Sequence, residues 1–270
     1  MTSKITLSLL LCSAFMFGAQ QAWADNFDRV DYAGEREYKG DKDWDVTLGA
    51  GALALPEYEG SDEYEVLPVP YIDASYKDIL TFNPFEGLRY NVFREGGITF
   101  GPGLGYDFGR DDDEGDRLRG LGDVDGTIEG QVFASYKAGM SSGEITFAHD
   151  LGDGHEGYTV EAELGHIIFL SENSAFIRPS ISTSYASDNY MSSYFGVNNV
   201  QAQNSVNNAF DADAGFKDVS VNVFASMPIT NHWSINGLAG YSRLMGDAAD
   251  SPVTEDKNQL MGGAFAAYRF

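Results

Sequence analysis

The sequence predicts an all-β protein: a transmembrane, antiparallel up-and-down β-barrel of the outer-membrane type, with about twelve strands. Three observations support this prediction. Short segments with alternating apolar and polar residues recur along the chain, as in barrel strands, where only every second residue faces lipid. Glycine and aromatic residues are abundant, with 31 Gly, 15 Tyr and 18 Phe in 270 residues. The chain also ends within a strand, on Phe270, two residues after Tyr268, as expected for a closing strand that reaches an aromatic belt.

The first 24 residues have the features of a secretory signal peptide. Lys4 supplies a positive charge, residues 5–19 are apolar, and Ala22-Trp23-Ala24 matches a small-x-small cleavage site. The apolar stretch is too short for a membrane-spanning helix. The sequence therefore predicts export through the periplasm to a Gram-negative outer membrane with cleavage of the signal peptide. Behind it we expect a flexible, charged periplasmic leader at 25–43 and the barrel at 44–270.

The chain has one cysteine and a large excess of acidic residues. Cys12 lies in the predicted signal peptide and lacks the small preceding residue of a lipoprotein site, so we expect no disulfide and no lipid anchor. Acidic residues number 41 against 17 basic ones, which gives a net charge of −24. Repulsion from phosphate then argues against nucleic acid as a partner.

The first four strands are predicted between residues 44 and 93. Residues 44–53 alternate, with Trp44 and Leu48 on the same face. Residues 66–76 form the second strand, although the two prolines in it suggest irregular pairing. Residues 79–82 and 87–93 predict a short pair of strands. If this pair were one irregular segment, the barrel would have ten strands.

Residues 98–108 give the clearest strand signal. One face is apolar and is predicted to contact lipid, whereas the other is small or polar and is predicted to face the lumen. The first face carries Ile98, Phe100, Pro102, Leu104, Tyr106 and Phe108, and the second carries Thr99, Gly101, Gly103, Gly105 and Asp107. The three glycines are not a nucleotide-binding loop, because no helix follows them. We expect them to bend the strand or to leave space in the lumen.

Seven further alternating segments bring the count to twelve. They lie at 126–138, 143–151, 157–170, 175–186, 219–229, 233–245 and 259–270. An even count places the short turns at one end, beside the N-terminus, and four long loops beginning at Pro56, Gly109, Ser187 and Gly246 at the other. Short periplasmic turns and long outer loops are typical of these barrels. A soluble β-sandwich or lipocalin-like barrel would show the same alternation, but the signal peptide and terminal Phe favour the membrane barrel.

The predicted lumenal face carries charges of both signs. We interpret them as a satisfied ion-pair network, since unpaired buried charges are costly, or alternatively as the lining of a solute path. These candidate residues are Arg89, Glu129, Lys137, Glu144, Asp150, Glu161, Glu163, Arg178 and Arg269. The sequence does not predict whether such a lumen conducts.

No pattern predicts catalysis, a cofactor or a metal site. The acidic loop from Asp111 to Asp125 offers oxygen ligands suited to Ca²⁺ or Mg²⁺, which also bridge lipopolysaccharide, but its spacing does not match an EF-hand. The four histidines are scattered, and His166 falls on the lipid-facing side, which predicts a place near a membrane interface. An outer-membrane protease or phospholipase is therefore disfavoured, and we predict a protein that is not an enzyme.

Several motifs in order resemble the MipA/OmpV family over nearly the whole mature chain. The first is Gly49-Ala50-Gly51-Ala52 with Pro56, Tyr58 and Gly60-Ser61, followed by Leu67-Pro68-Val69-Pro70. Tyr194-Phe195-Gly196-Val197 precedes the long loop in the same way. Tyr241, Leu244, Gly246-Asp247-Ala248 and Ser251-Pro252-Val253 match the family's ending, before Gln259 and the final Tyr-x-Phe. The long acidic loop departs from the family pattern.

The resemblance implies an outer-membrane barrel without catalytic residues. It implies contact with outer-membrane lipid and lipopolysaccharide, and insertion by the barrel-assembly machinery, which would read Tyr268 and Phe270 as an assembly signal. The family's namesake is a scaffold that joins a lytic murein transglycosylase to a penicillin-binding protein. Other members are linked to osmotic response or adhesion. The sequence thus leaves three functions open: a scaffold, a pore for solute uptake, and an adhesin acting through residues 187–217.

Overall fold

A computed structural model describes residues 43–170 and 175–270 of the protein. The predicted signal peptide, all but the last residue of the predicted leader and the predicted turn at 171–174 lie outside the described residues.

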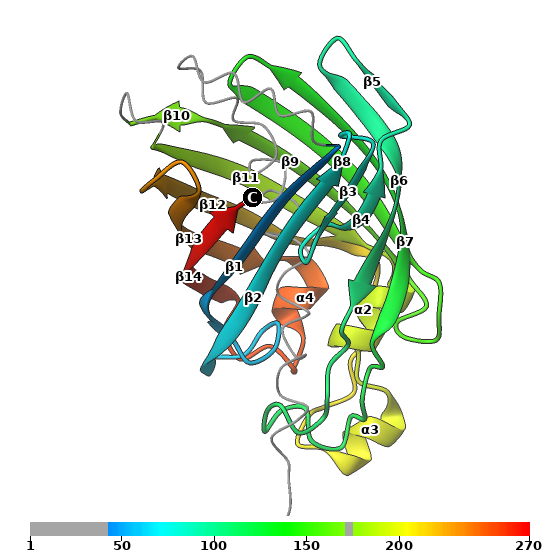
Figure 1. The fold of residues 1–270 in the computed structure, drawn as a ribbon. Coiled ribbons are helices and arrows are strands. Elements are labelled where there is room, and N and C mark those ends of the chain that lie inside the picture. Colours follow the sequence, from blue (N-terminus) through cyan, green and yellow to red (C-terminus); the bar gives the residue numbers. More distant parts are fainter. Residues whose placement is uncertain (1–42, 171–174) are drawn as a thin grey trace, which may run out of the picture.

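The described residues form a closed, antiparallel β-barrel (Figure 1). Strands that follow one another in the chain pair with each other, except that β4 and β5 both pair with β6 and that β9 and β10 both pair with β11. The pairings between β1 and β14 and between β9 and β11 complete the ring. The strands are β1 (Trp44–Pro56), β2 (Tyr64–Tyr76), β3 (Leu80–Asn83), β4 (Gly87–Tyr90), β5 (Phe93–Glu95), β6 (Ile98–Asp107), β7 (Thr127–Ala138), β8 (Ser141–Asp150), β9 (Tyr158–His166), β10 (Ile168–Phe169), β11 (Phe176–Ala186), β12 (Gly215–Pro228), β13 (Trp233–Leu244) and β14 (Asn258–Arg269).

The ring has twelve strand positions, which confirms the predicted number. β4 and β5 pair with successive parts of β6 and act as one strand. β9 and β10 likewise both pair with β11. The predicted short pair at 79–93 is therefore real, and the ten-strand alternative is wrong.

The two ends of the barrel differ in the length of their connections. The end with Trp44 and Phe270 carries short connections such as 77–79, 96–97, 139–140 and 229–232, and we call it the short-turn end. The opposite end, which we call the loop end, carries 57–63, 108–126, 151–157, 187–214 and 245–257.

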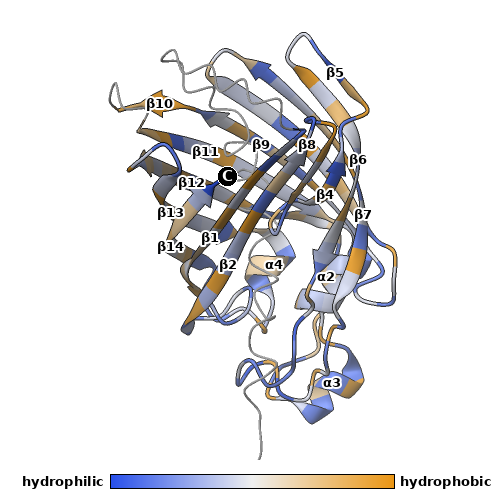
Figure 2. Ribbon diagram, in the orientation of Figure 1, coloured by the Kyte–Doolittle hydropathy of each residue, from blue (hydrophilic) through white to orange (hydrophobic). Residues whose placement is uncertain are grey.

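The outer surface of the barrel wall is apolar. Outward-facing side chains in the middle of the strands are exposed and aliphatic, for example Val132 (60%), Leu164 (65%) and Ile181 (50%), and Figure 2 shows the resulting alternation along each strand. Exposed aromatic residues lie at both ends of the strands. They are Trp44, Trp233 and Phe270 at the short-turn end, and Tyr64, Tyr106, Tyr158, Phe216 and Tyr241 at the loop end. Such an apolar band between two aromatic belts is the surface that a bilayer requires.

The wall is incomplete beside β2. β2 pairs with β1 over its whole length without a register shift, so the expected irregular pairing is absent on this side. On its other side, β2 pairs with β3 only from Ala74 to Tyr76. Pro68 and Pro70 lie in the part that has one strand neighbour among the described residues. The ladder with β1 continues through both prolines. Their backbone nitrogens, which carry no hydrogen, therefore point toward the open side of β2.

One sector of the barrel interior is apolar. We call it the lumenal apolar cluster; it contacts Leu67, Val69, Phe85, Ile167, Phe169 and Met261, and its buried members are Leu53, Leu55, Tyr71, Phe176, Phe224, Leu238, Phe265 and Ala267. Most of these residues come from β1, β2 and β11 to β14, whereas the buried charged residues of the wall lie mainly on β4 and β6 to β12. The interior therefore has an apolar side and a polar side.

The long loops at the loop end are folded. Residues 187–214, predicted as an irregular loop, contain α2 (Asp188–Phe195) and α3 (Asn199–Asn204), and 245–257 contains α4 (Gly246–Asp250). Asn198 caps α3 in a capping box with Gln201. Within the described part of the chain, no helix has the length and apolar character needed to cross a membrane.

The glycines of β6 allow close approach of the neighbouring backbone. A Cβ atom on Gly101 would lie 1.8 Å from the Tyr90 carbonyl oxygen, and one on Gly105 would lie 2.3 Å from the Gln131 side-chain nitrogen. Gly101 is needed because the backbone passes close to it between the end of β4 and the start of β5. Gly105 is needed because the side chain of Gln131 occupies the lumen beside it. This supports the expectation of lumen space and gives it a specific cause.

We predict that Gly101→Ala strongly reduces folding of the barrel. The new methyl group would collide with backbone, which cannot rotate away as a side chain can, and overpacking of this kind costs about 1–3 kcal/mol or more. The fraction of protein that migrates as folded barrel on an unheated denaturing gel measures the effect. Gly237→Ala is the control, because the nearest atom to its Cβ is the Gly263 carbonyl oxygen at 3.8 Å. Equal folding of both variants would contradict the prediction.

Candidate functional site

Two arginines organise the charged side of the lumen. Arg89 on β4 donates to Glu144 on β8, with 2.9 Å between Nη2 and Oε1, and lies 3.6 Å from Glu86. Arg178 on β11 lies 2.6 Å from Glu163 on β9. Gly165 makes space for this pair, because a Cβ there would lie 2.4 Å from the Arg178 guanidinium. All five charged side chains are buried.

The other candidate residues occupy different levels of the barrel. Glu161 is buried on β9, and Glu129 and Asp150 are buried near the loop end of β7 and β8. Lys137 is half-buried near the short-turn end. Arg269 is exposed at that rim, where its Nε lies 2.9 Å from Asp45 Oδ1.

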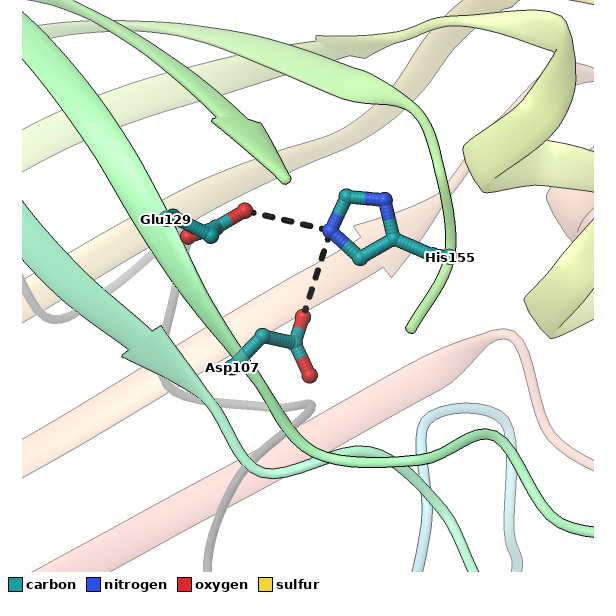
Figure 3. A group of neighbouring side chains, drawn as sticks. All are labelled: Asp107, Glu129 and His155. Atoms are coloured by element: carbon teal, nitrogen blue, oxygen red, sulfur yellow. Dashed lines mark hydrogen bonds and ion pairs between the residues drawn. The ribbon is translucent and has the colours of Figure 1, made fainter. Parts of the chain in front are cut away.

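A second cluster lies beneath α2 and contains Asp107, Glu129 and His155. Nε2 of His155 lies 3.2 Å from Glu129 Oε1 and 3.9 Å from Asp107 Oδ2. Figure 3 shows both carboxylates directed at the same ring nitrogen. Asp107 and Glu129 are each 1% exposed, as is His155. Tyr194 of α2 donates to Asp107 Oδ1 at 2.6 Å and thereby fixes the helix to the barrel wall.

The spacing of these three side chains is compatible with a metal ion, but the surroundings of the imidazole suit a proton better. The Gly157 N–H donates to Nδ1 of His155 at 3.0 Å. Metal-ligating histidines normally donate a proton from their second ring nitrogen, whereas this one accepts. The neutral ring therefore carries its proton on Nε2 and donates it to Glu129. The geometry describes an imidazole that is hydrogen-bonded to Glu129 and lies close to the carboxylate of Asp107.

The pKa of His155 reflects opposing effects. Burial lowers the pKa, but the hydrogen bond to Glu129 and the charges of Asp107, Glu129 and Asp150 outweigh it, so the pKa is raised above its ordinary value. The ring also contacts Tyr190 of α2 edge-on, with centroids 4.8 Å apart. The protonation state of His155 and the position of α2 on the barrel are thus linked, because the same ring contacts Tyr190.

A buried lysine connects the first long loop with β12. Lys217 Nζ lies 2.5 Å from Glu59 Oε1 and 3.0 Å from Asp218 Oδ2. Ser184 of β11 donates to the same Asp218 oxygen at 2.5 Å. Glu59 and Lys217 are 158 residues apart in the chain. This contact therefore joins the loop at 57–63 to the start of β12.

Four loops at the loop end pack together into one body, which we call the cap: residues 57–63, 108–126, 187–214 and 245–257. Two apolar clusters hold it. The first contains Val124, Ala186, Tyr190, Met191, Tyr194, Phe195, Ala212, Leu244 and Ala248, and the second contains Tyr58, Leu118, Leu121, Val197 and Val253. The predicted adhesive loop at 187–217 therefore contributes Tyr190, Tyr194 and Phe195 to the interior of the cap.

Hydrogen bonds between loops reinforce the cap. Arg110 donates to the Tyr194 carbonyl at 2.6 Å, Ser251 donates to the Phe195 carbonyl at 2.6 Å, and Tyr58 donates to the Val253 carbonyl at 3.1 Å. The first two bonds satisfy carbonyls at the C-terminal end of α2, where the helix has no further N–H groups to offer. The third joins the loops at 57–63 and 245–257. The cap is consequently a specific structure seated on the loop end.

The acidic loop is part of this cap. Burial raises the pKa of Glu114 to about 8, and the charge of Asp111 adds to the effect. Burial and the charges of Asp123 and Asp113 also raise the pKa of Asp111. Protonation of Glu114 and Asp111 therefore relieves the cost of burying their charged carboxylates beside other acidic groups.

Sequence reasoning missed the central residues of both loop-end contacts. Asp107 was recognised as lumenal but was not singled out, and His155 counted only as one of four scattered histidines. Glu59 and Lys217 carried no signal, because nothing local relates residues so far apart. Alternation would have placed Lys217 and Asp218 on opposite faces. Both are buried because the pairing of β11 with β12 shifts register at this point and leaves Lys217 as an extra residue.

The closed antiparallel ring, its apolar outer band between aromatic belts and its charged interior define an outer-membrane β-barrel protein. Residues 48–270 match the family described as MltA-interacting protein MipA. The chain belongs to this family, which confirms the resemblance found in the sequence motifs.

Named relatives agree with this assignment. The outer membrane protein Omp26La of Vibrio anguillarum is 28% identical over 211 residues, covering 73% of this chain and 80% of that protein. The outer membrane protein OmpV of Vibrio cholerae is 29% identical over 213 residues, with the same coverage of both chains.

Solved outer-membrane barrels are similar at lower level. A COG4313 outer membrane channel from Pseudomonas putida F1 gives a TM-score of 0.42 at 10% identity, covering 90% of this chain and 99% of that one. OmpT of Vibrio cholerae gives 0.40 at 9% identity, covering 84% and 97%.

We predict that the cap is more stable at pH 5.5 than at pH 8. Glu114 ordinarily titrates near 4.5 and here near 8, so the folded cap holds a proton that the open loop has lost. Stability therefore falls as pH rises through this interval. Hydrogen exchange of residues 108–126, corrected for intrinsic rates, measures it. Glu114→Gln should flatten the pH dependence, whereas the control Asp116→Asn, at an exposed residue, should preserve it. An unchanged profile in Glu114→Gln would contradict this assignment.

Proposed function

We propose that this protein is a non-enzymatic outer-membrane scaffold that binds murein enzymes at its periplasmic rim. The family description, MltA-interacting protein, supports a lytic murein transglycosylase as one partner; a penicillin-binding protein is the second partner that the sequence resemblance implies. The observation that carries the proposal is the cap. The cap fills the loop end with the protein's own side chains. In barrels of this kind the short turns face the periplasm. The short-turn end and the predicted leader are therefore the surfaces at which we propose a periplasmic partner binds.

The rim at the short-turn end has the character of a protein-binding surface. It presents exposed ion pairs of both signs, including Lys77 with Asp43 at 3.2 Å and Arg94 with Asp78 at 3.2 Å. Such exposed pairs add little stability and are free to exchange for charges on a partner. Asp43, the last residue of the predicted leader, lies at this same end.

The arrangement of side chains argues against catalysis. Ser141 and His166 approach to 2.8 Å between Oγ and Nδ1, but both are exposed at the short-turn rim. Nucleophilic sites need a third group that orients the histidine, and the described residues place none on the other nitrogen of this ring. The ring nitrogens of His155 face Glu129 and the Gly157 N–H, and among the residues described no hydroxyl or thiol is hydrogen-bonded to this ring.

A pore for solute uptake is the second candidate. The observation that favours it is the row of buried charged groups on β4 and β6 to β12, including unpartnered oxygens on Asp107, Glu129 and Glu161. The cap opposes it, because a diffusing solute would have to displace α2 and its contacts.

We predict that the full chain in detergent micelles binds a purified lytic murein transglycosylase, and that deletion of residues 26–42 weakens binding about tenfold, or ~1.4 kcal/mol. Surface plasmon resonance gives the affinities. Replacement of Val200 and Val206, which are exposed on the cap, is the control and should leave binding unchanged. Failure of the full chain to bind would remove the scaffold proposal, and equal loss from both variants would indicate a non-specific effect.

We predict that the protein is electrically silent in a planar bilayer because the cap seals the loop end. Tyr194→Ala removes the hydroxyl that ties α2 to Asp107 and should produce conductance steps. Val200→Ala on exposed α3 is the matched control and should remain silent. Steady open-channel current from the unmodified protein would instead favour the pore.

A further inference from the structure

The opening in the barrel wall beside β2 has not been used by the function proposed above. Residues 64–73 of β2 have β1 on one side and no strand on the other among the described residues. The neighbouring hairpin of β3 and β4 turns at 84–86, and its last ladder contact with β6 is Leu88 with Leu104. Figure 1 shows this hairpin turning back well short of the loop end of β2. The gap therefore lies in the loop-end half of the wall.

This opening faces lipid. On the outward side of the same stretch, Val66 is 70% exposed and Ile72 is 40% exposed, and Tyr64 lies at the level of the loop-end aromatic belt. Backbone groups that lack partners inside a bilayer are costly. Pro68 and Pro70 reduce this cost by removing two donors from the open edge.

The prolines also determine what can occupy the edge. An added β-strand would need N–H donors at alternate positions, and the two prolines withhold them. Pairing with a strand of another protein or of a second copy is therefore disfavoured. A molecule that has no hydrogen-bonding groups of its own fits this edge better.

The interior surface directly behind the edge is apolar. Leu67 and Val69 point inward and are half-buried, as is Phe85 at the tip of the β3–β4 hairpin. Tyr71 is 3% exposed, and its ring stacks on Phe265 with centroids 5.0 Å apart and contacts Phe85 at 6.1 Å. These residues belong to the lumenal apolar cluster, which continues to β11, β12 and β13. Apolar side chains thus lie on both faces of this stretch of β2, outward at Val66 and Ile72 and inward at Leu67 and Val69.

We propose that this opening admits one acyl chain of a membrane lipid, which lies along the inner side of β2 against Leu67, Val69 and Phe85. An acyl chain matches the site in three respects. It is apolar, it makes no hydrogen bonds, and it is already present at the outer face of the same strand. Its entry would cover half-buried apolar side chains, and burial of apolar surface is favourable.

Quenching by brominated lipid tests this proposal. Trp44, Trp233 and Trp23 are replaced by Phe, and a single Trp is introduced in each variant. Val69→Trp reports the inner side of the opening. Val66→Trp, on the outward face of the same strand, is the lipid-exposed control. Phe224→Trp is the inward control on β12, which has strands on both sides. The folded proteins are reconstituted in phosphatidylcholine vesicles with and without bromine on the acyl chains.

The proposal expects Val69→Trp to lose emission to brominated lipid as Val66→Trp does, while Phe224→Trp retains its emission. Quenching of Val69→Trp no greater than that of Phe224→Trp would overturn it. Aqueous acrylamide provides the second readout: if acrylamide quenches Val69→Trp and brominated lipid does not, the opening is filled with water and the proposal is wrong. Should Val69→Trp fail to fold, Leu67→Trp probes the same inward face two residues away.

Discussion

Backbone hydrogen bonding inside a bilayer is the constraint on which this structure depends. A strand in lipid has no water to satisfy its N–H and C=O groups, so the sheet must close on itself. The chain meets this requirement through two pairings, of β14 with β1 and of β9 with β11. Once the ring is closed, every outward side chain meets lipid and every inward side chain meets the lumen. The apolar band, the aromatic belts and the buried charges all follow from that division.

The short hairpin of β3 and β4 is the exception, and the surrounding sequence is adapted to it. Because Gly101 has no Cβ, the backbone of Tyr90 can approach it more closely than any other residue would allow. Pro68 and Pro70 occupy the edge that the hairpin leaves open. The apolar residues behind this edge replace the polar lining found elsewhere in the lumen. The interior is therefore divided between an apolar sector beside the opening and a charged sector on the complete wall.

The charged sector and the cap depend on each other. Ion pairs such as Arg178 with Glu163 sit deep in the barrel, where breaking one partner would leave an uncompensated charge. Nearer the loop end, acidic groups are in excess, and Asp107, Glu129 and Glu59 are compensated partly by His155 and Lys217. Asp107 contacts Tyr194 of the cap, His155 packs against Tyr190, and Lys217 binds Glu59. The cap is thus attached to the barrel through its electrostatically least balanced region.

The sequence by itself determined the barrel, its twelve strands and the faces of those strands. It could do so because alternation with a period of two is local, and within each strand it separates the residues that face lipid from those that face the lumen. The order of the sequence motifs also indicated the family. The sequence also indicated most of the buried charges. Only the tertiary structure decided that 187–217 folds into a cap, that the wall is open beside β2 without disturbing the ladder to β1, and which charges meet. Glu59 reaches Lys217, and Asp107 reaches Tyr194, across distances in sequence that no local pattern spans. Such contacts arise from closure of the ring, which brings the ends of distant strands to one rim.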